Sequence, residues 1–347
     1  MNISTVGLDL AKNVFQVHAV DRLGRPVLRK TLRRAEMTSF FTKLSPCLIG
    51  MEACAGAHFW ARKLKELGHT VRLMAPQFVK PYVKGNKNDA RDAEAICEAV
   101  SRPTMRYVPV KSKEQQAALA LHRVRQGFVT ARTAQVNQIR GLLGEFGIVL
   151  RKGISSINRQ VPEILEDGEN SLTGSSRELF QRLFQHFREL DRQVRELEVA
   201  IQAWHRQNEE CERLEKVPGI GPITATALVA TVGDARAFRS GRQMAAWLGL
   251  VPRQDSSGGK ERLLGISKRG DVYLRTLLIH GARSFLLSVK RRGIDSEGWL
   301  GRLLQRRSLN VAVVALANKN ARIVWALLAH RRCYQPDFQA TAGVATA

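Results

Sequence analysis

The first hundred residues alternate between short apolar runs and amphipathic stretches. Runs with the length and period of strands lie at residues 3–9, 14–20, 26–33, 47–51 and 70–74. A turn-like segment at 21–25 predicts an antiparallel hairpin between the second and third strands. Helical spacing of apolar positions predicts helices at residues 36–44, 57–67 and 89–100. The predicted order is three antiparallel strands, then helix, strand, helix, strand and helix.

This is the order of an RNase H-like α/β domain, and it brings acidic residues together. Asp9 lies at the end of the first strand, and Glu52 closes the strand at 47–51. In such a sheet both ends lie side by side, with the helix at 89–100 packed across them. Asp89 and Asp92 are three residues apart, so they share one face near the positive end of that helix dipole. The pair alone could simply cap the helix. All four acids at these positions favour a divalent metal site, because Mg²⁺ takes oxygen ligands.

Beyond residue 112 the apolar pattern is mostly helical. A continuous helix rich in Arg and Gln is predicted over 113–146, and apolar helices are predicted at 273–289 and 310–330. The segment 151–175, which contains Pro162, is typical of a linker. The arginines of the first helix could line a nucleic-acid surface or a solvated face: Arg123, Arg125, Arg132 and Arg140.

A heptad pattern predicts a coiled coil over residues 176–212. Its seam positions alternate by three and four residues: Phe180, Leu183, Phe187, Leu190, Val194, Leu197, Ile201, Trp204, Asn208 and Cys211. Asn208 would be the polar core position that sets the register. The pattern favours assembly with a second subunit, and pairing with the preceding long helix of the same chain is the alternative.

A Pro-Gly-x-Gly turn follows at residues 218–221, between two predicted helices. This is the helix-hairpin-helix pattern, in which Gly219 and Gly221 would let backbone N–H groups approach a phosphate. A plain corner between two helices fits the same residues equally well.

The segment 253–271 combines hydroxyl groups, glycines and cations. Ser256 and Ser257 precede Gly258 and Gly259, and the nearby cations are Lys260, Arg262, Lys268, Arg269 and Arg275. A serine among cations could attack a phosphate whose charge they offset. Composition alone favours a flexible basic loop, since Ser-Gly runs are the default flexible segment.

The net charge of the chain narrows the classes of binding partner. The 347 residues include 55 Lys and Arg against 31 Asp and Glu, which gives a net charge of +24 spread along the chain. This distribution fits a protein that neutralises phosphates over a wide surface. The sequence offers no continuous run of about 18 apolar residues that would mark a membrane span. Five separated cysteines without a CxxC pair, and a start unlike a signal peptide, favour a reduced cytoplasmic protein.

Together these motifs resemble the insertion-sequence 110 family of transposases, and its 1111 subgroup most closely. The matching segments are Gly7-Leu8-Asp9-Leu10-Ala11-Lys12, Gly50-Met51-Glu52-Ala53, Lys87-Asn88-Asp89-Ala90-Arg91-Asp92, Ser256-Ser257-Gly258-Gly259-Lys260 and Ile266-Ser267-Lys268-Arg269-Gly270-Asp271. The resemblance implies a RuvC-like domain with the metal tetrad Asp9, Glu52, Asp89 and Asp92. It also implies a coiled coil and a C-terminal transposase domain with a catalytic serine, here Ser257, with Ser256 as the alternative.

The resemblance further implies DNA recombination guided by an element-encoded RNA, in a homo-oligomer, a dimer or a tetramer, with Mg²⁺ at the tetrad. Expected domains are a RuvC-like domain at 1–150, the linker, the coiled coil, a mostly helical transposase domain at 213–335 and a disordered tail at 336–347. Lys87 and Arg91 beside the tetrad join the later cations and glycines as candidate nucleic-acid contacts. The rival hypotheses are a metal-dependent nuclease that uses water, and a non-enzymatic nucleic-acid packaging protein.

Overall fold

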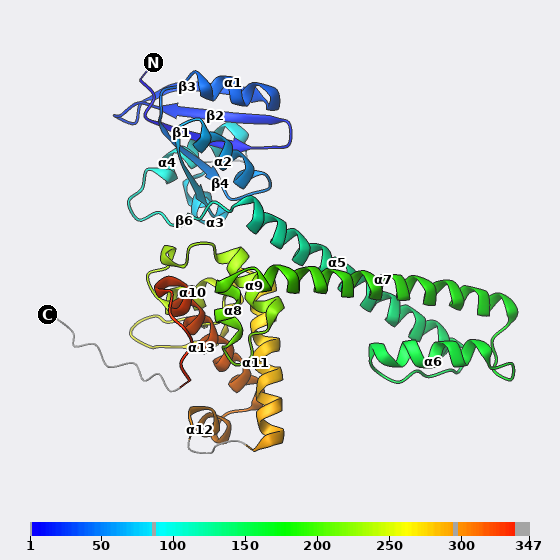
Figure 1. Ribbon diagram of the computed structural model, residues 1–347. Helices are drawn as coiled ribbons and strands as arrows, with labels where there is room; N and C mark the ends of the chain where they lie inside the picture. The colour runs from blue at the N-terminus through cyan, green and yellow to red at the C-terminus, as the bar shows by residue number, and fades with distance from the viewer. Residues whose placement is uncertain (1, 85–87, 294–297, 337–347) are drawn as a thin grey trace. The chain divides into compact units, whose positions relative to one another are not determined.

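The computed structural model describes residues 2–84, 88–293 and 298–336, which form two compact units. The first unit comprises residues 1–113 together with 232–239, and the second comprises 114–231 and 240–347. Lys87 and the segment 337–347 of the expected tail lie outside the described residues. The first unit is mixed α/β and the second is mostly helical, as the sequence predicts (Figure 1).

The first unit is built on a six-stranded sheet with the order β3-β2-β1-β4-β5-β6. β1 is antiparallel to β2 and parallel to β4, while β5 is parallel to β4 and antiparallel to β6. The predicted bounds of β2, β3 and β5 agree with the structure, while β6, only two residues long, was not predicted. The strand bounds are β1 Thr5–Leu10, β2 Val14–Val20, β3 Pro26–Arg33, β4 Leu48–Glu52, β5 Thr70–Met74 and β6 Tyr107–Val108.

Helices cover both faces of this sheet. On one face, Val6 and Leu8 of β1 join a buried core with α1 and α2, in which Phe41 and Trp60 are the large side chains. On the other face α4 packs across β1, β2 and β4. The helices are α1 Met37–Thr42, α2 Ala57–Glu66, α3 Pro76–Val79 and α4 Asp89–Val100, with 3-10 turns at Arg34–Glu36, Lys80–Tyr82 and Ala235–Ala237.

The second unit contains long and short helices and one small hairpin. Its helices are α5 Lys113–Glu145, α6 Ile154–Glu166, α7 Gly174–Arg206, α8 Glu209–Glu215, α9 Pro222–Val232, α10 Gly241–Trp247, α11 Val272–Arg292, α12 Trp299–Arg306 and α13 Leu309–His330. The hairpin consists of β7 Pro252–Gln254 and β8 Leu263–Ile266, paired antiparallel. We call it the serine hairpin because its turn contains Ser256 and Ser257.

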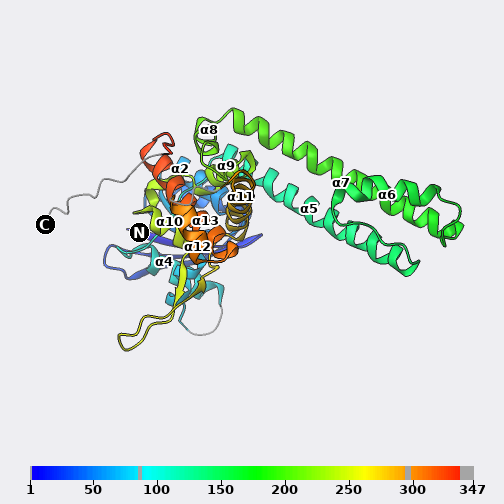
Figure 2. The same ribbon diagram turned by 90° about the horizontal axis from the view of Figure 1, so that it is seen from below.

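Helices α5, α6 and α7 form a long helical hairpin, here called the arm (Figures 1 and 2). Its far end is a buried cluster in which Phe180 and Phe187 of α7 pack with Ile139 of α5 and Ile157 of α6. The heptad seam is therefore filled, in this chain, by intramolecular partners. The segment 151–175 contains the helix α6 rather than only a linker, because the helix continues through Pro162 and joins that core.

One seam residue has a different role from the predicted one. Helix α7 ends at Arg206, and Asn208 is the N-cap of α8, where its side chain accepts a hydrogen bond from the Cys211 backbone N–H. The prediction of Asn208 as a polar coiled-coil core position was wrong. Asn is a preferred N-cap, so the same residue that interrupts a heptad also starts a new helix.

Helix α13 is long and apolar enough to cross a membrane by length and composition alone. The sequence prediction had identified no such segment. In the structure α13 contacts α10 and α11, and Ala312, Leu316 and Val324 are buried against them. Its apolar character is accounted for by this packing, as in the central helix of a helical domain.

Candidate active site

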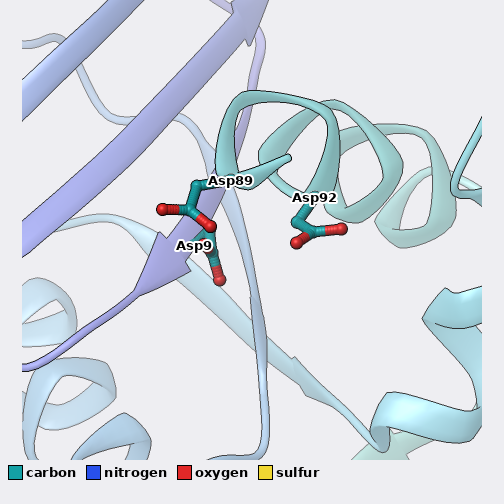
Figure 3. A group of neighbouring side chains, drawn as sticks. All are labelled: Asp9, Asp89 and Asp92. Carbon is teal, nitrogen blue, oxygen red and sulfur yellow. The ribbon is translucent and has the colours of Figure 1, made fainter. Parts of the chain in front are cut away.

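Three of the four predicted acids converge in the first unit. Carboxylate oxygens of Asp9, Asp89 and Asp92 lie within 4.8 Å of one another. Asp9 is at the end of β1, and Asp89 and Asp92 stand on the first turn of α4 above it (Figure 3). Asp9 and Asp92 are half-buried and Asp89 is exposed, so the cluster opens to solvent on one side. The predicted convergence of strand end and helix start is what the structure contains.

A Gly-x-acid pattern on two adjacent strands builds this arrangement. Gly7 and Gly50 are register partners on β1 and β4, and each precedes an acid, Asp9 or Glu52, by two residues. A Cβ on Gly7 would lie 2.1 Å from the Ala93 carbonyl oxygen of α4. A Cβ on Gly50 would lie 2.7 Å from the Val100 side chain. The glycines therefore let α4 approach the sheet, and the acids at the next positions on the same face meet its first turn.

The cap of α4 is Asn88 rather than either aspartate. The Asn88 side chain accepts a hydrogen bond of 2.9 Å from the Ala90 backbone N–H. Asp89 and Asp92 are thus in the first turn, where the helix dipole favours negative charge, without having to serve as the cap. The sequence contained this signal, since Asn is a strong N-cap residue directly before a helical pattern.

Glu52 lies beside the cluster and interacts with it electrostatically. Burial raises the pKa of the Glu52 carboxyl, and the negative charges of Asp9 and Asp92 raise it further. Its oxygens are not part of the group of three within 4.8 Å. Parallel pairing of Leu8 with Met51 puts Asp9 and Glu52 at neighbouring strand ends. A positive ion in the cluster would relieve the repulsion that these carboxylates exert on one another.

The donor set fits a hard divalent cation. Closely spaced carboxylate oxygens from separate chain segments are the ligands that Mg²⁺ and similar ions prefer. Two basic side chains of the first unit pair with other acids of α4: Lys84 with Glu98, and Arg29 with Glu94. Arg91 is exposed on the first turn of α4.

The predicted serines belong to the second unit, at the tip of the serine hairpin. Ser257 and Lys260 form a β-bridge, and the two glycines between them have positive φ angles of 55° and 78°. Successive positive φ angles are the mark of a tight hairpin turn. The turn is exposed, as are Lys260 and Arg262 beside it. The chain here forms the turn of a hairpin.

The two serines differ in their hydrogen bonding. The Ser256 hydroxyl accepts a hydrogen bond of 3.2 Å from the Arg262 backbone N–H across the hairpin. Within the described part of the chain, the Ser257 hydroxyl has no such bond. Ser256 is thus used to close the hairpin, while Ser257 offers a hydroxyl at an exposed turn.

Two of the candidate nucleic-acid contacts are occupied by internal packing. Arg275 is only 7% exposed, and its guanidinium donates to the Leu248 and Arg269 carbonyl oxygens at 3.0 and 3.1 Å. It supports the base of the hairpin and does not face solvent, which corrects its interpretation as a phosphate contact. Gly219, with a φ of 88°, packs against Gly281 of α11; a Cβ there would lie 2.9 Å from the Gly281 carbonyl oxygen.

The other candidates remain available. Gly221 has open space around its Cα, and Lys268 and Arg269 are exposed between β8 and α11. The packing of Gly219 favours the plain helix-corner interpretation of the Pro-Gly-x-Gly turn. Sequence reasoning also missed a buried polar network around His122, whose members lie up to 151 residues apart and so leave no local signal.

Comparison with known proteins gives matches in both units. A family model described as a transposase matches residues 6–148. A second model, described as transposase of the IS116/IS110/IS902 family, matches residues 211–295. The fold and the acidic cluster thus belong to a transposase, a class of enzyme that cuts and rejoins DNA.

Full-length relatives define the family. A probable family 20 transposase of Pseudomonas aeruginosa is 57% identical over 97% of this chain and 100% of the relative. The transposase for insertion sequence element IS1111A of Coxiella burnetii is 44% identical over 96% and 92%. The transposase for IS1328 of Yersinia enterocolitica is 45% identical over 93% and 96%. The chain belongs to the IS110/IS116/IS902 family of transposases, as the sequence motifs predict.

Proposed function

We propose that this transposase cuts and rejoins DNA through a serine nucleophile, Ser257, assisted by an acidic metal site. The observation that carries the proposal is the convergence of Asp9, Asp89 and Asp92 at one end of the sheet. The second support is the exposed Ser257 hydroxyl beside Lys260 and Arg262. The acids could bind a cation that holds a DNA phosphate, and the hairpin carries a hydroxyl that could attack a phosphate.

In the first step the Ser257 hydroxyl attacks a DNA phosphorus. A new P–O bond to serine forms as the bond to the DNA 3′-oxygen breaks, and the electron pair leaves on that oxygen, which takes up a proton. The serine proton passes to solvent. One phosphodiester replaces another, so a 3′-hydroxyl of the exchanged strand can later reverse the step and release serine without an external energy source. Lys260 and Arg262 would offset charge on the phosphate.

Asp9, Asp89 and Asp92 would hold the divalent metal, proposed to be Mg²⁺, with Glu52 next to them. When bound, such an ion supplies Lewis-acid polarisation of a phosphate oxygen. The order of the sheet and the position of the acids at its strand ends support a RuvC-like character for the first unit. Exposed Arg91 and Lys268 are proposed DNA or RNA contacts.

We extend the proposal to a structured guide RNA and to assembly into a homo-oligomer, on the basis of the resemblance of the motifs. The net charge of +24 is compatible with binding both nucleic acids. Purification under conditions that retain bound nucleic acid, followed by ribonuclease treatment and sequencing, tests the RNA. A bound transcript from outside the element would contradict this part of the proposal.

A covalent adduct tests the nucleophile. Incubation with end-labelled element DNA, followed by denaturation, is expected to leave DNA attached to the wild-type protein and to Ser256→Ala. The adduct should be absent from Ser257→Ala. The reverse result would move the nucleophile to Ser256, and continued cleavage without an adduct in both variants would contradict serine catalysis altogether.

A metal-dependent nuclease that uses water is the second candidate. The observation in its favour is that the acidic cluster lies entirely within the first unit, so hydrolysis needs no residue of the second. It predicts cleaved products with no protein attached and no effect of either serine substitution. Non-enzymatic packaging has no comparable support, because transposases act on DNA as enzymes.

A further inference from the structure

A group of buried and half-buried polar side chains joins four helices of the second unit where the arm begins. His122 of α5 is only 2% exposed. Its Nδ1 lies 3.0 Å from the Tyr273 hydroxyl of α11, and its Nε2 lies 2.9 Å from the Thr226 hydroxyl of α9. Arg125, three residues after His122 on α5, donates two hydrogen bonds from its guanidinium to Glu198 of α7.

The protons of this chain can be assigned. The Thr226 hydroxyl donates its one hydrogen to the backbone carbonyls of α9, 2.9 Å from Pro222 and 3.1 Å from Ile223. With its hydrogen used in this way Thr226 accepts from His122, and we assign the ring proton to Nε2. Burial, together with the Arg125 charge, lowers the pKa of His122 to about 4, so the ring is neutral at physiological pH. The bare Nδ1 then accepts from the Tyr273 hydroxyl.

The bonds then run in one direction, from Tyr273 through His122 to Thr226 and the α9 carbonyls. Replacing any of these three side chains by an apolar one leaves a polar partner without its hydrogen bond. These hydrogen bonds hold α5 in one position relative to α9 and α11. A shift of α5 would break them.

The first turn of α11 also holds the base of the serine hairpin. Arg275, two residues after Tyr273, donates to carbonyl oxygens on both sides of the hairpin, at Leu248 before β7 and Arg269 after β8. The Ser267 and Lys268 backbone N–H groups bond to the Val251 and Gly249 carbonyls at 2.8 and 3.1 Å. The base of the hairpin is thus fixed to the same helical turn that carries Tyr273.

We propose that Tyr273, His122 and Thr226 are positioning residues. They couple the position of the arm helix α5 to the position of the serine hairpin. The proposal rests on the proposed role of Ser257 as the nucleophile. Arg125 and Glu198 lie on α5 and α7, the two long helices of the arm. A partner or a nucleic acid that binds the arm and shifts α5 would therefore act on the hairpin through the hydrogen bonds of His122. The hairpin tip is exposed and is supported mainly at its base, which makes the base the place where its direction is set.

Hydrogen exchange of the full-length protein tests the linkage without using activity. Tyr273→Phe keeps the ring and removes only the hydroxyl, and Thr226→Val removes the acceptor of His122. Both variants are expected to exchange the Ser267 and Lys268 amides about tenfold faster than wild type, because one buried hydrogen bond is lost. Thr226→Ser, which keeps the hydroxyl, should restore wild-type exchange.

The control is Asp191→Asn, which removes the negative charge that pairs with Arg132 and Arg195 farther along the arm. It should accelerate exchange in α5 and α7 and leave the hairpin amides unchanged. Unchanged hairpin exchange in folded Tyr273→Phe and Thr226→Val, or equal acceleration in Asp191→Asn, would overturn the proposal.

Kinetics provide the second readout. With DNA saturating, Tyr273→Phe should slow strand cleavage about tenfold and leave DNA affinity unchanged, because the proposed role of Tyr273 is to position the hairpin. A loss confined to DNA affinity would count against a positioning role. If Ser257 is not the nucleophile, the adduct test fails while the hairpin exchange still responds, so the two proposals can fail separately.

Discussion

The acidic cluster and the serine hairpin are held in place by opposite means. Asp9 and Glu52 end strands that lie inside a six-stranded sheet, and α4 is pressed against those strands over two glycines. Ser257 stands at an exposed turn whose support is concentrated at its base, through Arg275 and two backbone hydrogen bonds. Close packing fixes the first set, and a few polar contacts fix the second.

This difference suits the two proposed roles. A metal site needs its ligands held at fixed distances before DNA arrives, and a packed core supplies that rigidity. A nucleophile that must reach a phosphate and later be released is better carried on a small element that can be reoriented. Substitutions in the sheet should therefore affect stability and metal binding together, while substitutions in the hairpin should affect rate with little cost to stability.

The largest expected effect is from removing one acid. Asp9→Ala should reduce strand cleavage about 10³-fold while DNA binding remains near wild type, because the charge stabilisation of the reacting phosphate is lost. A gel-based cleavage assay with a parallel binding titration measures both. Glu66→Ala, an exposed acid on α2, is the matched control and should cleave normally. Wild-type cleavage by Asp9→Ala would rule out the acidic cluster as the catalytic site.

Matched glycine substitutions compare the two regions directly. In Gly7→Ala the new Cβ would lie 2.1 Å from a backbone oxygen of α4, and overpacking of this kind costs about 3 kcal/mol. In Gly258→Ala the Cβ meets nothing within 4 Å, and the left-handed φ costs about 1 kcal/mol. Urea denaturation measures both free energies of unfolding. Equal losses of unfolding free energy in the two variants would contradict the proposed difference between the packed sheet and the exposed hairpin turn.

Acidification should weaken the second unit through His122. The pKa of His122 is lowered from 6.5 to about 4 by burial, so the unfolded chain binds the proton more tightly between these values. Stability is present above pH 6.5 and is lost as pH falls; between pH 7 and pH 5 the loss is about 2 kcal/mol. Urea denaturation at several pH values should show this slope, and the slope should shrink in a folded His122→Gln variant.

For Glu52 in the first unit we expect the opposite pH dependence of stability. Its pKa is raised above the usual carboxyl value, so its contribution to stability is lost as pH rises and recovered on acidification. Local hydrogen exchange at low pH should therefore show the second unit weakening more than the first. A uniform response of both units would contradict this contrast.

The smallest expected effect concerns the helix cap beneath the acidic cluster. Asn88→Ala removes the bond to the Ala90 N–H and should cost about 1 kcal/mol, whereas Asn88→Ser should cost much less, since Ser is also a good cap. The Mg²⁺ concentration that gives half-maximal cleavage should rise modestly in Asn88→Ala. Equal stability of the two variants would show that the cap does not hold this turn.

Much of the first unit could be predicted from local pattern. The alternation in residues 14–20 predicts one strand, the turn at 21–25 predicts its hairpin partner at 26–33, and the acids at strand ends follow once the order of elements is known. The wrong or incomplete predictions share a cause. Asn208, Arg275 and Gly219 were interpreted from residue type, but their roles depend on which neighbours the fold brings to them. From sequence Arg275 is a candidate phosphate contact, whereas in the structure it is buried and donates a hydrogen bond to the Leu248 carbonyl.

The second unit was harder to predict because its contacts are long-range. His122 and Tyr273 are 151 residues apart, and no spacing rule connects them. Likewise α6 follows a glycine-bearing turn and contains Pro162, so its local signals indicate a linker, and only its packing against α5 and α7 makes it part of the arm.

The parallel pairing of β1 with β4 restricts how the length of this chain can vary. Side chains alternate between the two faces of a sheet with a period of two, so an insertion or deletion of one residue in either strand turns the following acid to the opposite face. The same change also moves the preceding glycine from beneath α4 and puts a side chain there instead. Length changes that keep the acids together should therefore be confined to connections such as the turn at 21–25, and an alignment gap inside 5–10 or 48–52 would mark a copy of the element that has lost its chemistry.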